Sequence, residues 1–354
     1  MGTASSSQNG KPGYFTVLQG KWAGPWMLQL SSKELAELPE ELSAATLSIR
    51  KKIGRRNVAY PMPVGAHSVT ISKSFRPRTS DVVIITFHKT GTTLCQQMCH
   101  QLRTDGTSTD FKEITEVMPW IDFAWEIDQD LTTDQVASPR LFKSHARLSA
   151  IQEGCKYICT IRDPIKTLVS LFRFFTAKFP NPPFPASWLA NVDNFAKCPL
   201  WAIDSIWGGN YWDYMTEFWL CRDEPNLLLL SFEDLSSDME KEIPKVAKFM
   251  GVEKAAENPD VVAKVLELSS RKYMSDHSDQ FSEGWFYEEQ LRLKRYDRPP
   301  LPPVAKVHAS SLQLTPSEET IAWMQAKWDV KVTPKTGCKT YADMLSKLQG
   351  TTEE

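Results

Sequence analysis

The stretch DVVIITFHKTGTTLCQQMCHQL, Asp81–Leu102, decides the fold, because it begins as a strand and ends as a helix. Its first part, Val82–Phe87, is an apolar and β-rich run that predicts a buried strand. The part from Thr92 onward continues as a helix, and Lys89-Thr90-Gly91-Thr92-Thr93 stands between the two. The stretch therefore predicts a tight turn that leads from a buried strand into a helix.

This turn has the chemistry of an anion site. A glycine lets the backbone curl tightly, so that the first N–H groups of the helix point at whatever lies above the sheet, where the helix dipole also favours negative charge. Threonines add hydroxyl donors and can cap the helix, and Lys89 adds a full positive charge, which an ordinary helix cap would not explain. The residues expected to hold a phosphate are Lys89, Thr90, Gly91, Thr92 and Thr93.

The turn differs from the nucleoside-triphosphate loop Gly-x-x-x-x-Gly-Lys-Ser/Thr. Lys89 precedes the only glycine of the turn, and no Asp-rich segment obviously supplies magnesium. A P-loop kinase is therefore the less favoured interpretation, and the expected ligand is a phosphate that needs no metal.

Strands and helices alternate along the rest of the chain. Further strands are predicted at Tyr157–Ile161 and Leu227–Ser231, each followed by a helical run. Apolar strands without polar alternation are typical of a parallel sheet covered on both faces, so the sequence predicts an α/β fold with a central parallel sheet flanked by helices. We expect residues 75–350 to form this domain, residues 1–74 to be a partly flexible extension with one helix, and residues 351–354 to be a tail.

Composition limits the function. The chain of 354 residues has a net charge of −2, so no large basic excess exists to neutralise the phosphates of a nucleic acid. Seven scattered cysteines without a Cys-x-x-Cys pair argue against a zinc site or a disulfide framework. No apolar run is long enough to span a membrane, and the polar N-terminus lacks the apolar core of a signal peptide. We therefore expect a cytoplasmic protein that binds neither metal nor nucleic acid.

Two further segments contain candidate catalytic and binding residues. In PRLFKSHARL, Pro139–Leu148, an extended chain would point Lys143 and His145 to the same side. A histidine that shares a face with a lysine near a strand end is a candidate for proton transfer. In YICTIRDPIKTLVSLFRF, Arg162 ends a strand and Ser170 follows eight residues later in a helix. An arginine guanidinium can bind a phosphate through two parallel hydrogen bonds.

In their order and spacing, these motifs resemble those of the soluble sulfotransferases, which use 3'-phosphoadenosine-5'-phosphosulfate (PAPS). The resemblance rests on Lys-Thr-Gly-Thr-Thr after a strand, on Lys-Ser-His, and on Arg-Asp-Pro with a serine eight residues after the arginine. The segments GGNYWDYMTEFW with LLLLSFEDL, and LELSSRKYMSDHSDQF, are also similar to family segments. The similarity runs from about Phe75 to Leu348 and implies a P-loop-like sulfotransferase fold.

The resemblance implies a role for each motif. Residues Lys89 to Thr93 would hold the 5'-phosphosulfate end, with Lys89 at the bridging oxygen, and Arg162 and Ser170 would hold the 3'-phosphate. His145 would be the general base that takes the proton from an acceptor hydroxyl or amine, and Lys143 would help to bind the sulfuryl group. The other implied cofactor contacts are Phe232, where a tyrosine usually lies near the adenine, and Ser269, where a threonine is usual.

The chain also departs from the family pattern. In the loop, His88 replaces a proline, Thr90 a serine and Leu94 a tryptophan. The adenine thereby loses a stacking platform, for which Phe232 is a candidate substitute. The family's Arg-Lys-Gly loop over the 3'-phosphate is missing, and its C-terminal dimer signature is not recognisable, which leaves the oligomeric state open. The candidates for the role of the missing loop are Lys306, Arg295 and Arg298.

The acceptor pocket is expected around His145. The segment EITEVMPWIDFAWEIDQDLTTD, Glu113–Asp134, contains seven acidic residues and no Lys, Arg or His, with aromatic residues between them. Such a segment is typical of a solvated acidic face, but it also fits a pocket for a cationic or amine-bearing small molecule. The predicted acceptor-binding residues are Trp120, Phe123, His145 and Phe174.

The predicted activity is sulfuryl transfer from PAPS to a hydroxyl or amine of a small molecule, in line and without a metal. Positioned cations and N–H donors would stabilise the charge that develops on the leaving phosphate. The missing Arg-Lys-Gly loop keeps open a second interpretation, a non-catalytic protein on the same fold that binds PAPS or its product 3'-phosphoadenosine-5'-phosphate (PAP).

Overall fold

The computed structural model describes residues 75–179, 185–198, 209–294 and 314–350, together with the single residues Ser48, Lys52, Ser72, Ser74, Trp201 and Val304. The helix predicted in the N-terminal extension lies almost entirely outside the described residues. So do the tail and the three candidates for the missing loop, Lys306, Arg295 and Arg298.

Four parallel strands form the centre of the described part. They are β1 (Val82–Thr86), β2 (Leu141–Ser144), β3 (Lys156–Ile161) and β4 (Leu227–Ser231), in the order β2-β1-β3-β4. Every neighbouring pair is parallel, with Val82 opposite both Leu141 and Lys156. The three apolar runs singled out in the sequence are thus strands, and the segment of Lys143 supplies the fourth. The predicted α/β fold with a central parallel sheet is confirmed.

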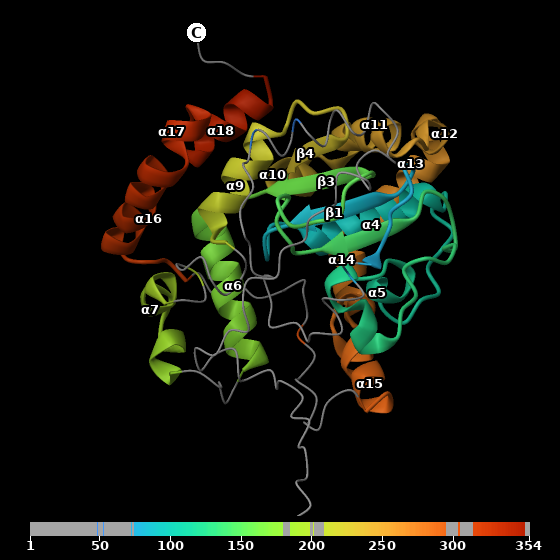
Figure 1. Cartoon of the computed structure of the whole chain (residues 1–354), viewed down its shortest axis with the longest axis horizontal. Coiled ribbons are helices and arrows are strands. Elements are labelled where there is room, and N and C mark those ends of the chain that lie inside the picture. The colour runs from blue at the N-terminus through green and yellow to red at the C-terminus, as the bar shows by residue number, and fades with distance from the viewer. Residues whose placement is uncertain are drawn as a thin grey trace, which may run out of the picture.

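Helices cover both faces of this sheet (Figure 1). Because successive side chains of a strand point to opposite faces, Val83 and Ile85 pack in one core and Val82 and Ile84 in the other. The first core includes α6 (Pro164–Lys178) and α9 (Tyr211–Leu220). The second core includes α4 (Thr92–Arg103), α11 (Met239–Met250) and α13 (Pro259–Leu268).

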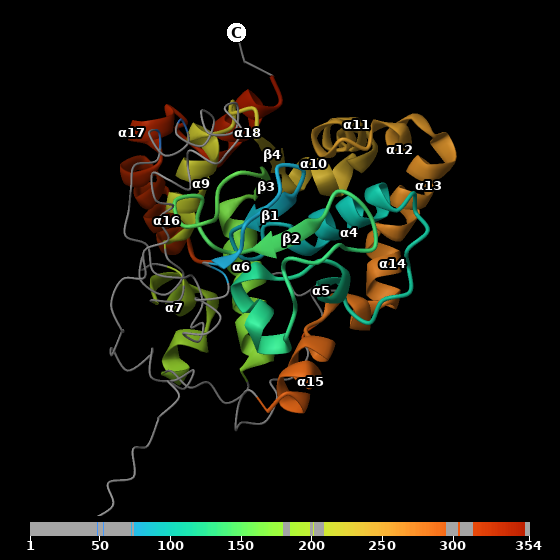
Figure 2. The same cartoon turned by 45° about the vertical axis from the view of Figure 1, so that its right-hand side comes forward.

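The remaining helices surround this three-layered centre. Figure 2 shows α6, α7 and α15 projecting on the same side of the sheet, and α16 and α17 pack beside α9. These helices are α5 (Ile114–Val117), η1 (Ile121–Ile127), η2 (Ala186–Leu189), α7 (Val192–Lys197), α10 (Phe232–Ser237), α12 (Glu253–Glu257), α14 (Arg271–Asp276), η3 (Ser278–Phe281), α15 (Gly284–Arg292), α16 (Glu318–Lys331), α17 (Thr333–Thr336) and α18 (Tyr341–Leu348).

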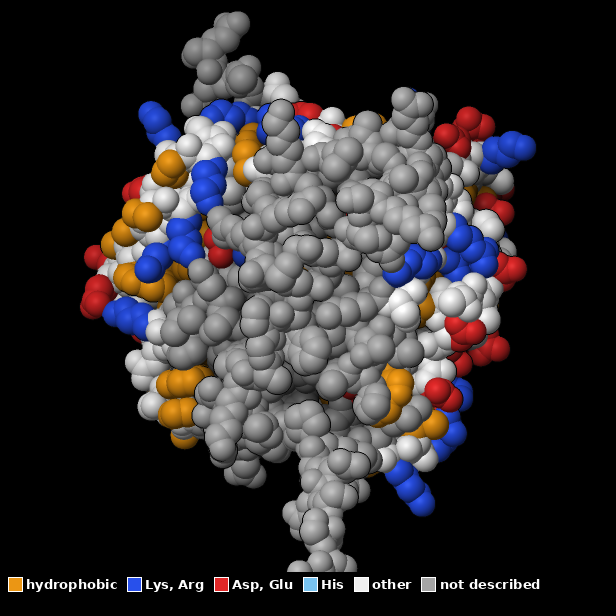
Figure 3. Space-filling view, viewed as in Figure 1, with side chains coloured by type: hydrophobic (Ala, Val, Ile, Leu, Met, Phe, Trp, Pro, Cys, Tyr) orange, Lys and Arg blue, Asp and Glu red, His pale blue; other side chains and the backbone are white. Residues whose placement is uncertain are grey.

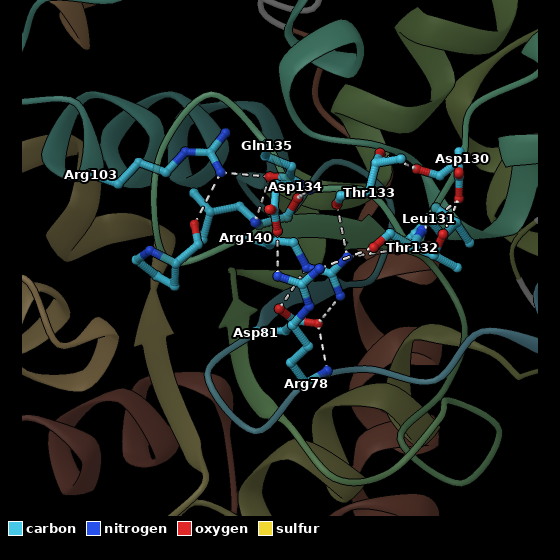
Figure 4. A network of polar contacts seen from close by, with 12 residues as sticks. Arg78, Asp81, Arg103, Asp130, Leu131, Thr132, Thr133, Asp134, Gln135 and Arg140 are labelled. Atoms are coloured by element: carbon cyan, nitrogen blue, oxygen red, sulfur yellow. Dashed lines mark hydrogen bonds and ion pairs between the residues drawn. The ribbon is translucent and has the colours of Figure 1, made fainter.

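A network of charged residues ties the segment before β2 to the start of β1 (Figure 4). The Nε and Nη2 atoms of Arg140 donate to the two carboxylate oxygens of Asp81, at 3.0 and 2.6 Å. Arg78 forms an ion pair of 2.5 Å with Asp134, and Asp130 accepts hydrogen bonds within its own loop. This network lies at the amino ends of the strands and leaves their carboxyl ends open to the predicted site residues.

Candidate active site

The main predicted site residues come together at the carboxyl ends of the four strands. Lys89 follows β1, His145 follows β2, Arg162 follows β3 and Phe232 follows β4. In an open parallel sheet, ligands bind at this edge, near the strand where the order of connections reverses. Here that strand is β1, which lies between β2 and β3.

The loop between β1 and α4 passes through left-handed backbone conformations at two residues. The φ angle is 64° at Lys89 and 110° at Gly91. A glycine takes such a conformation freely, whereas a residue with a side chain loses about 1–2 kcal/mol, so the strain at Lys89 stands at a candidate functional position. A Cβ atom at Gly91 would also lie 2.7 Å from Cδ2 of Phe232. A turn of this kind before a helix is typical of anion-binding loops.

The hydroxyls of Thr90 and Thr92 correct one part of the prediction, because they bond inside the protein. Oγ1 of Thr90 donates to the carbonyl of Phe87 at 2.8 Å, and Oγ1 of Thr92 lies 2.6 Å from Oγ1 of Thr86. Neither caps α4, whose N-cap residue is Gly91 and has no side-chain cap. The start of α4 therefore offers a ligand anion its backbone N–H groups, whereas the hydroxyl proton of Thr90 is directed to Phe87.

Arg162 supports the loop from the next strand. Its Nη1 donates to the carbonyl oxygen of Lys89 at 2.7 Å, and its guanidinium lies 4.0 Å from the ring centroid of Phe232. Burial lowers the pKa of Arg162, while the carboxylates of Glu233 and Asp163 oppose this shift. A guanidinium beside the loop is the group expected to bind a phosphate through two hydrogen bonds. Its bond to the loop also stabilises the backbone turn at Lys89.

The two predicted serines differ in their surroundings. Ser170 lies in α6, eight residues after Arg162, and is half-buried. Ser269 ends α13 and is buried, and its hydroxyl oxygen has no hydrogen-bond partner among the described residues. Gln97 of α4 donates to the adjacent carbonyl of Leu268 at 3.1 Å, which places Ser269 beside α4. A buried hydroxyl without a protein partner fits contact with a ligand.

His145 is held from three directions. Its backbone N–H donates to Asp122 at 2.7 Å, and its carbonyl accepts from the hydroxyl of Tyr214 at 2.6 Å. Its Nδ1 lies 2.9 Å from the carbonyl oxygen of Thr86. Because a carbonyl oxygen only accepts, Nδ1 carries the proton and Nε2 is the basic nitrogen, as a general base requires.

Asp122 is a site residue that the sequence interpretation did not single out. Besides the N–H of His145, its carboxylate accepts from Nε1 of Trp120 at 2.9 Å and from Oγ of Ser144 at 2.8 Å. Burial raises the pKa of Asp122, and these hydrogen bonds oppose that shift. One carboxylate thus fixes three residues at the end of β2. No local pattern separates it from the other six acidic residues of its segment.

Lys143 and His145 share one side, as predicted, and Trp120 lies against both. The Nζ of Lys143 is 3.5 Å from the centroid of the Trp120 ring, and the rings of Trp120 and His145 are 5.5 Å apart, nearly edge to face. Phe123 packs behind Trp120, with the ring centroids 4.5 Å apart, and both contact aromatic residues of α15. The structure therefore places Trp120 at His145 and Phe123 one ring further away.

Phe174 lies on the side of Lys89. The ammonium groups of Lys89 and Lys178 are each 4.9 Å from the centroid of its ring. Lys178 forms a buried ion pair with Glu283, which also accepts a hydrogen bond of 2.5 Å from the hydroxyl of Tyr287. This pair links α6 to the start of α15 beside the candidate site, and the sequence interpretation did not predict it.

The acidic segment Glu113–Asp134 does not line the site as a group. Asp122 and Glu113 are buried and accept backbone hydrogen bonds, Asp130 and Asp134 belong to the loop network, and two other acidic residues are exposed. Around the described rim of the face in Figure 3, acidic and basic side chains are interspersed. Glu113, Asp122 and Glu126 are buried, so the segment is not the solvated acidic face of its alternative interpretation either. The carboxylate contacts described above lie mainly within the local structure.

The described residues also bear on metal binding, membrane insertion and thiol chemistry. Within the described ranges, no group of three or more His, Cys, Asp or Glu side chains is placed to hold a metal ion. In the same part of the chain, no helix combines the length and the apolar character needed to cross a bilayer. The seven cysteines are all buried as free thiols.

Comparison with known proteins identifies the family of the chain. Residues 79–290 match the family model described as the sulfotransferase domain. Cytosolic sulfotransferase 5 of Arabidopsis thaliana is 27% identical over 226 residues, 58% of this chain and 68% of the relative. Sulfotransferase 2A1 of Homo sapiens is 28% identical over 235 residues, 62% and 78% of the two chains. Among solved structures, retinol dehydratase in a complex with retinol and PAP has the same fold, with a TM-score of 0.51 and 15% identity over 78% of this chain and 86% of that one. The chain belongs to the sulfotransferase family.

Proposed function

We propose that the chain transfers a sulfuryl group from PAPS to a hydroxyl or amine of a small-molecule acceptor. One observation carries the proposal. The Lys89 loop and His145, whose Nε2 is the basic nitrogen, both lie at the carboxyl ends of the parallel strands. Membership of the sulfotransferase family supports sulfuryl transfer in general. The solved relative that holds PAP supports this choice of cofactor.

The described residues fit PAPS in several ways. Residues Lys89 to Thr93 would bind the 5'-phosphosulfate end through backbone N–H groups, and Arg162 with Ser170 would bind the 3'-phosphate. Phe232 and the buried hydroxyl of Ser269 would lie toward the nucleoside. Lys306, outside the described residues, stays a proposed contact. When bound, PAPS supplies a sulfuryl group on a phosphate leaving group.

His145, Lys89 and Lys143 have different roles in the proposed transfer. His145 takes the proton of the acceptor hydroxyl or amine at Nε2 as the acceptor atom bonds to sulfur. Lys89 stabilises the negative charge left on the phosphate oxygen when the S–O bond breaks, and Lys143 stabilises the sulfuryl oxygens. Because Asp122, Tyr214 and Thr86 already hold His145, little reorganisation accompanies the proton transfer.

The acceptor would lie against aromatic faces, with Trp120 on the side of His145 and Phe174 on the side of Lys89. A cationic or amine-bearing acceptor stays a prediction, which the positions of the carboxylates in Glu113–Asp134 do not strengthen. The expected cytoplasmic location is likewise a prediction.

A transfer assay tests the proposal. The full chain is incubated with PAPS and a panel of phenols, sterols, aliphatic amines and guanidinium compounds, and mass spectrometry detects the gain of one sulfuryl group. PAP should bind tightly without magnesium, and ATP weakly. Tight PAP binding without transfer to any acceptor would favour a non-catalytic binding protein. Magnesium-dependent phosphoryl transfer from ATP would instead support a kinase.

A further inference from the structure

His88 stands where the resemblance to the family leads to the expectation of a proline, directly before Lys89. Its ring lies face on to that of His145, with the centroids 4.1 Å apart and the planes inclined by 33°. The edge of Phe87 supports it at 5.8 Å. Aromatic rings at such a separation are in direct contact.

Other residues also contact His145. Trp120 meets the His145 ring edge on, at 82°, and Nδ1 bonds to Thr86 at the ring's margin. Asp122 and Tyr214 bond only to the backbone of His145, so they do not fix rotation of the ring. Besides the bond of Nδ1 to Thr86, the His145 ring thus contacts the rings of Trp120 and His88.

The charges around His88 suit a ring that stays neutral. Burial lowers its pKa to about 3, Lys143, Lys178 and Lys89 act in the same direction, and Glu283 opposes them. A neutral ring beside His145 does not repel the imidazolium that forms when His145 takes a proton, whereas a second imidazolium would repel it. A titrating neighbour would thus hinder a general base, and His88 avoids that hindrance.

We propose that His88 is a positioning residue for the transfer reaction, and that its ring stacks on His145 and keeps Nε2 of His145 facing the acceptor. The inference rests on the proposed function for its meaning in catalysis. It goes beyond that function because it assigns a role to a residue at which the chain departs from the family pattern.

Three variants separate the ring of His88 from its polarity. His88→Phe keeps a flat ring, His88→Asn keeps polarity without a ring, and His88→Ala removes both. We expect the Asn and Ala variants to lower kcat about ten- to a hundredfold, with the Kd for PAP within about twofold of that of the unaltered protein, and His88→Phe to restore most of kcat. His277→Ala is a matched control. The ring of the exposed His277 also stacks on an aromatic ring, that of Tyr273, with the centroids 4.0 Å apart, and His277 is not one of the proposed transfer residues.

A second measurement does not depend on activity. Nitrogen-15 shifts of the His145 ring report which nitrogen carries the proton. The unaltered protein and His88→Phe should show the Nδ1–H tautomer that the Thr86 carbonyl selects. In the Asn and Ala variants the ring should rotate away from that carbonyl and show a mixture of both tautomers. The same tautomer in all four proteins would overturn the inference. The inference would also be overturned if His88→Asn kept kcat and His88→Phe lost it. His88 would then act through a hydrogen-bonding nitrogen rather than through its flat ring. Absence of transfer by the unaltered protein would count against the proposed function, and the shifts would still decide the role of His88.

Discussion

The guanidinium of Arg162 donates a hydrogen bond to the carbonyl oxygen of Lys89, with 2.7 Å between Nη1 and the oxygen. Lys89 has a left-handed backbone there, with a φ of 64°. The residue proposed for the 3'-phosphate therefore holds in place the residue proposed for the leaving phosphate. Because one side chain serves both ends of the proposed cofactor site, its loss should affect affinity and turnover together.

Arg162→Ala should weaken PAP binding at least about tenfold, because a charge-assisted bidentate contact is lost, and should also lower kcat because the Lys89 turn loses its support. Calorimetric titration of PAP and steady-state kinetics with PAPS measure the two effects. Arg162→Lys should recover part of the affinity but little of the kcat, since an ammonium cannot reproduce the guanidinium fork.

Arg222→Ala provides the control for Arg162. Arg222 also stacks on an aromatic ring, that of Trp219 at 4.2 Å, and also donates to a backbone carbonyl, at 2.8 Å, but it lies away from the site. Its removal should leave affinity and kcat unchanged. Equal losses of ATP and PAPS affinity in Arg162→Ala would contradict the 3'-phosphate role, because ATP has no 3'-phosphate.

His145→Ala should nearly abolish turnover and keep PAP binding. Removal of a general base costs about 10²–10⁴-fold in rate, while the phosphate contacts of the loop remain. Single-turnover assays and PAP titration on the same preparation separate the two quantities. A variant that kept the activity of the unaltered protein would remove His145 from the mechanism.

Asp122 offers a test of how His145 is held. Asp122→Ala leaves the N–H of His145, Nε1 of Trp120 and the hydroxyl of Ser144 without their acceptor, so we expect a loss of about 2–4 kcal/mol in the free energy of unfolding and a lower kcat. In Asp122→Asn, the amide oxygen can accept from His145 and Trp120 while its NH₂ faces the Ser144 hydroxyl, which can also accept. The Asn variant should therefore keep most of the stability. Urea denaturation measures the difference, and equal losses in both variants would show that the charge matters more than the geometry.

The fold was predictable because its signals are local. The three apolar runs became β1, β3 and β4, and the glycine turn before Thr92 marked the start of α4, since burial of a whole strand leaves a continuous apolar pattern. The contact of His88 with His145 joins two residues that are 57 positions apart in the sequence (145 − 88), and no spacing rule predicts it. The pair of Lys178 and Glu283 spans 105 positions and depends on how α15 packs.

The sequence also did not predict the direction in which the side chains at the strand ends point. Thr90 and Thr92 have the composition of a phosphate-binding loop, yet their hydroxyls turn toward Phe87 and Thr86. Composition predicts which groups are available, but the packing of neighbouring strands decides which of them face a ligand. For this reason Asp122, one of seven acidic residues in its segment, was not distinguished before the structure showed what it bonds.

Two buried histidines should make the fold sensitive to acid. Burial lowers the pKa of both His88 and His100 to about 3, from a usual value of 6.5. Below pH 6.5 the unfolded chain binds protons that the folded chain does not, so stability should fall as the pH decreases from about 6.5 toward about 3. Each histidine contributes up to about 1.4 kcal/mol per pH unit in this window.

His88→Phe isolates one of these two contributions. It removes the titrating group and keeps a ring of similar shape, so the free energy of unfolding should decline less steeply between pH 6 and pH 5, by about 1 kcal/mol per pH unit relative to the unaltered protein. Urea denaturation at several pH values gives both slopes. Identical slopes would mean that His88 takes up a proton as readily in the folded protein as in the unfolded chain.

Gly91→Ala should damage the anion site through two separate effects. A φ of 110° is unfavourable for any residue with a side chain, at about 1–2 kcal/mol, and the new Cβ would lie 2.7 Å from Cδ2 of Phe232. The ring of Phe232 cannot retreat freely, because it lies against the guanidinium of Arg162 at 4.0 Å. We therefore expect reduced stability and PAP binding that is at least about tenfold weaker, measured by urea denaturation and calorimetry.

Gly337→Ala separates the two effects, because its φ is 71° and an added Cβ would have no atom within 4 Å. Gly337→Ala should lower the free energy of unfolding only through its unfavourable backbone conformation, and it should leave PAP binding unchanged. Gly91→Ala combined with Phe232→Ala removes the collision but keeps the backbone strain, so part of the stability should return, while PAP affinity should stay low because Phe232 is itself a proposed contact. If Gly91→Ala alone bound PAP with the affinity of the unaltered protein, the curled loop could not be the phosphate site, and the convergence at the ends of the strands would need another explanation.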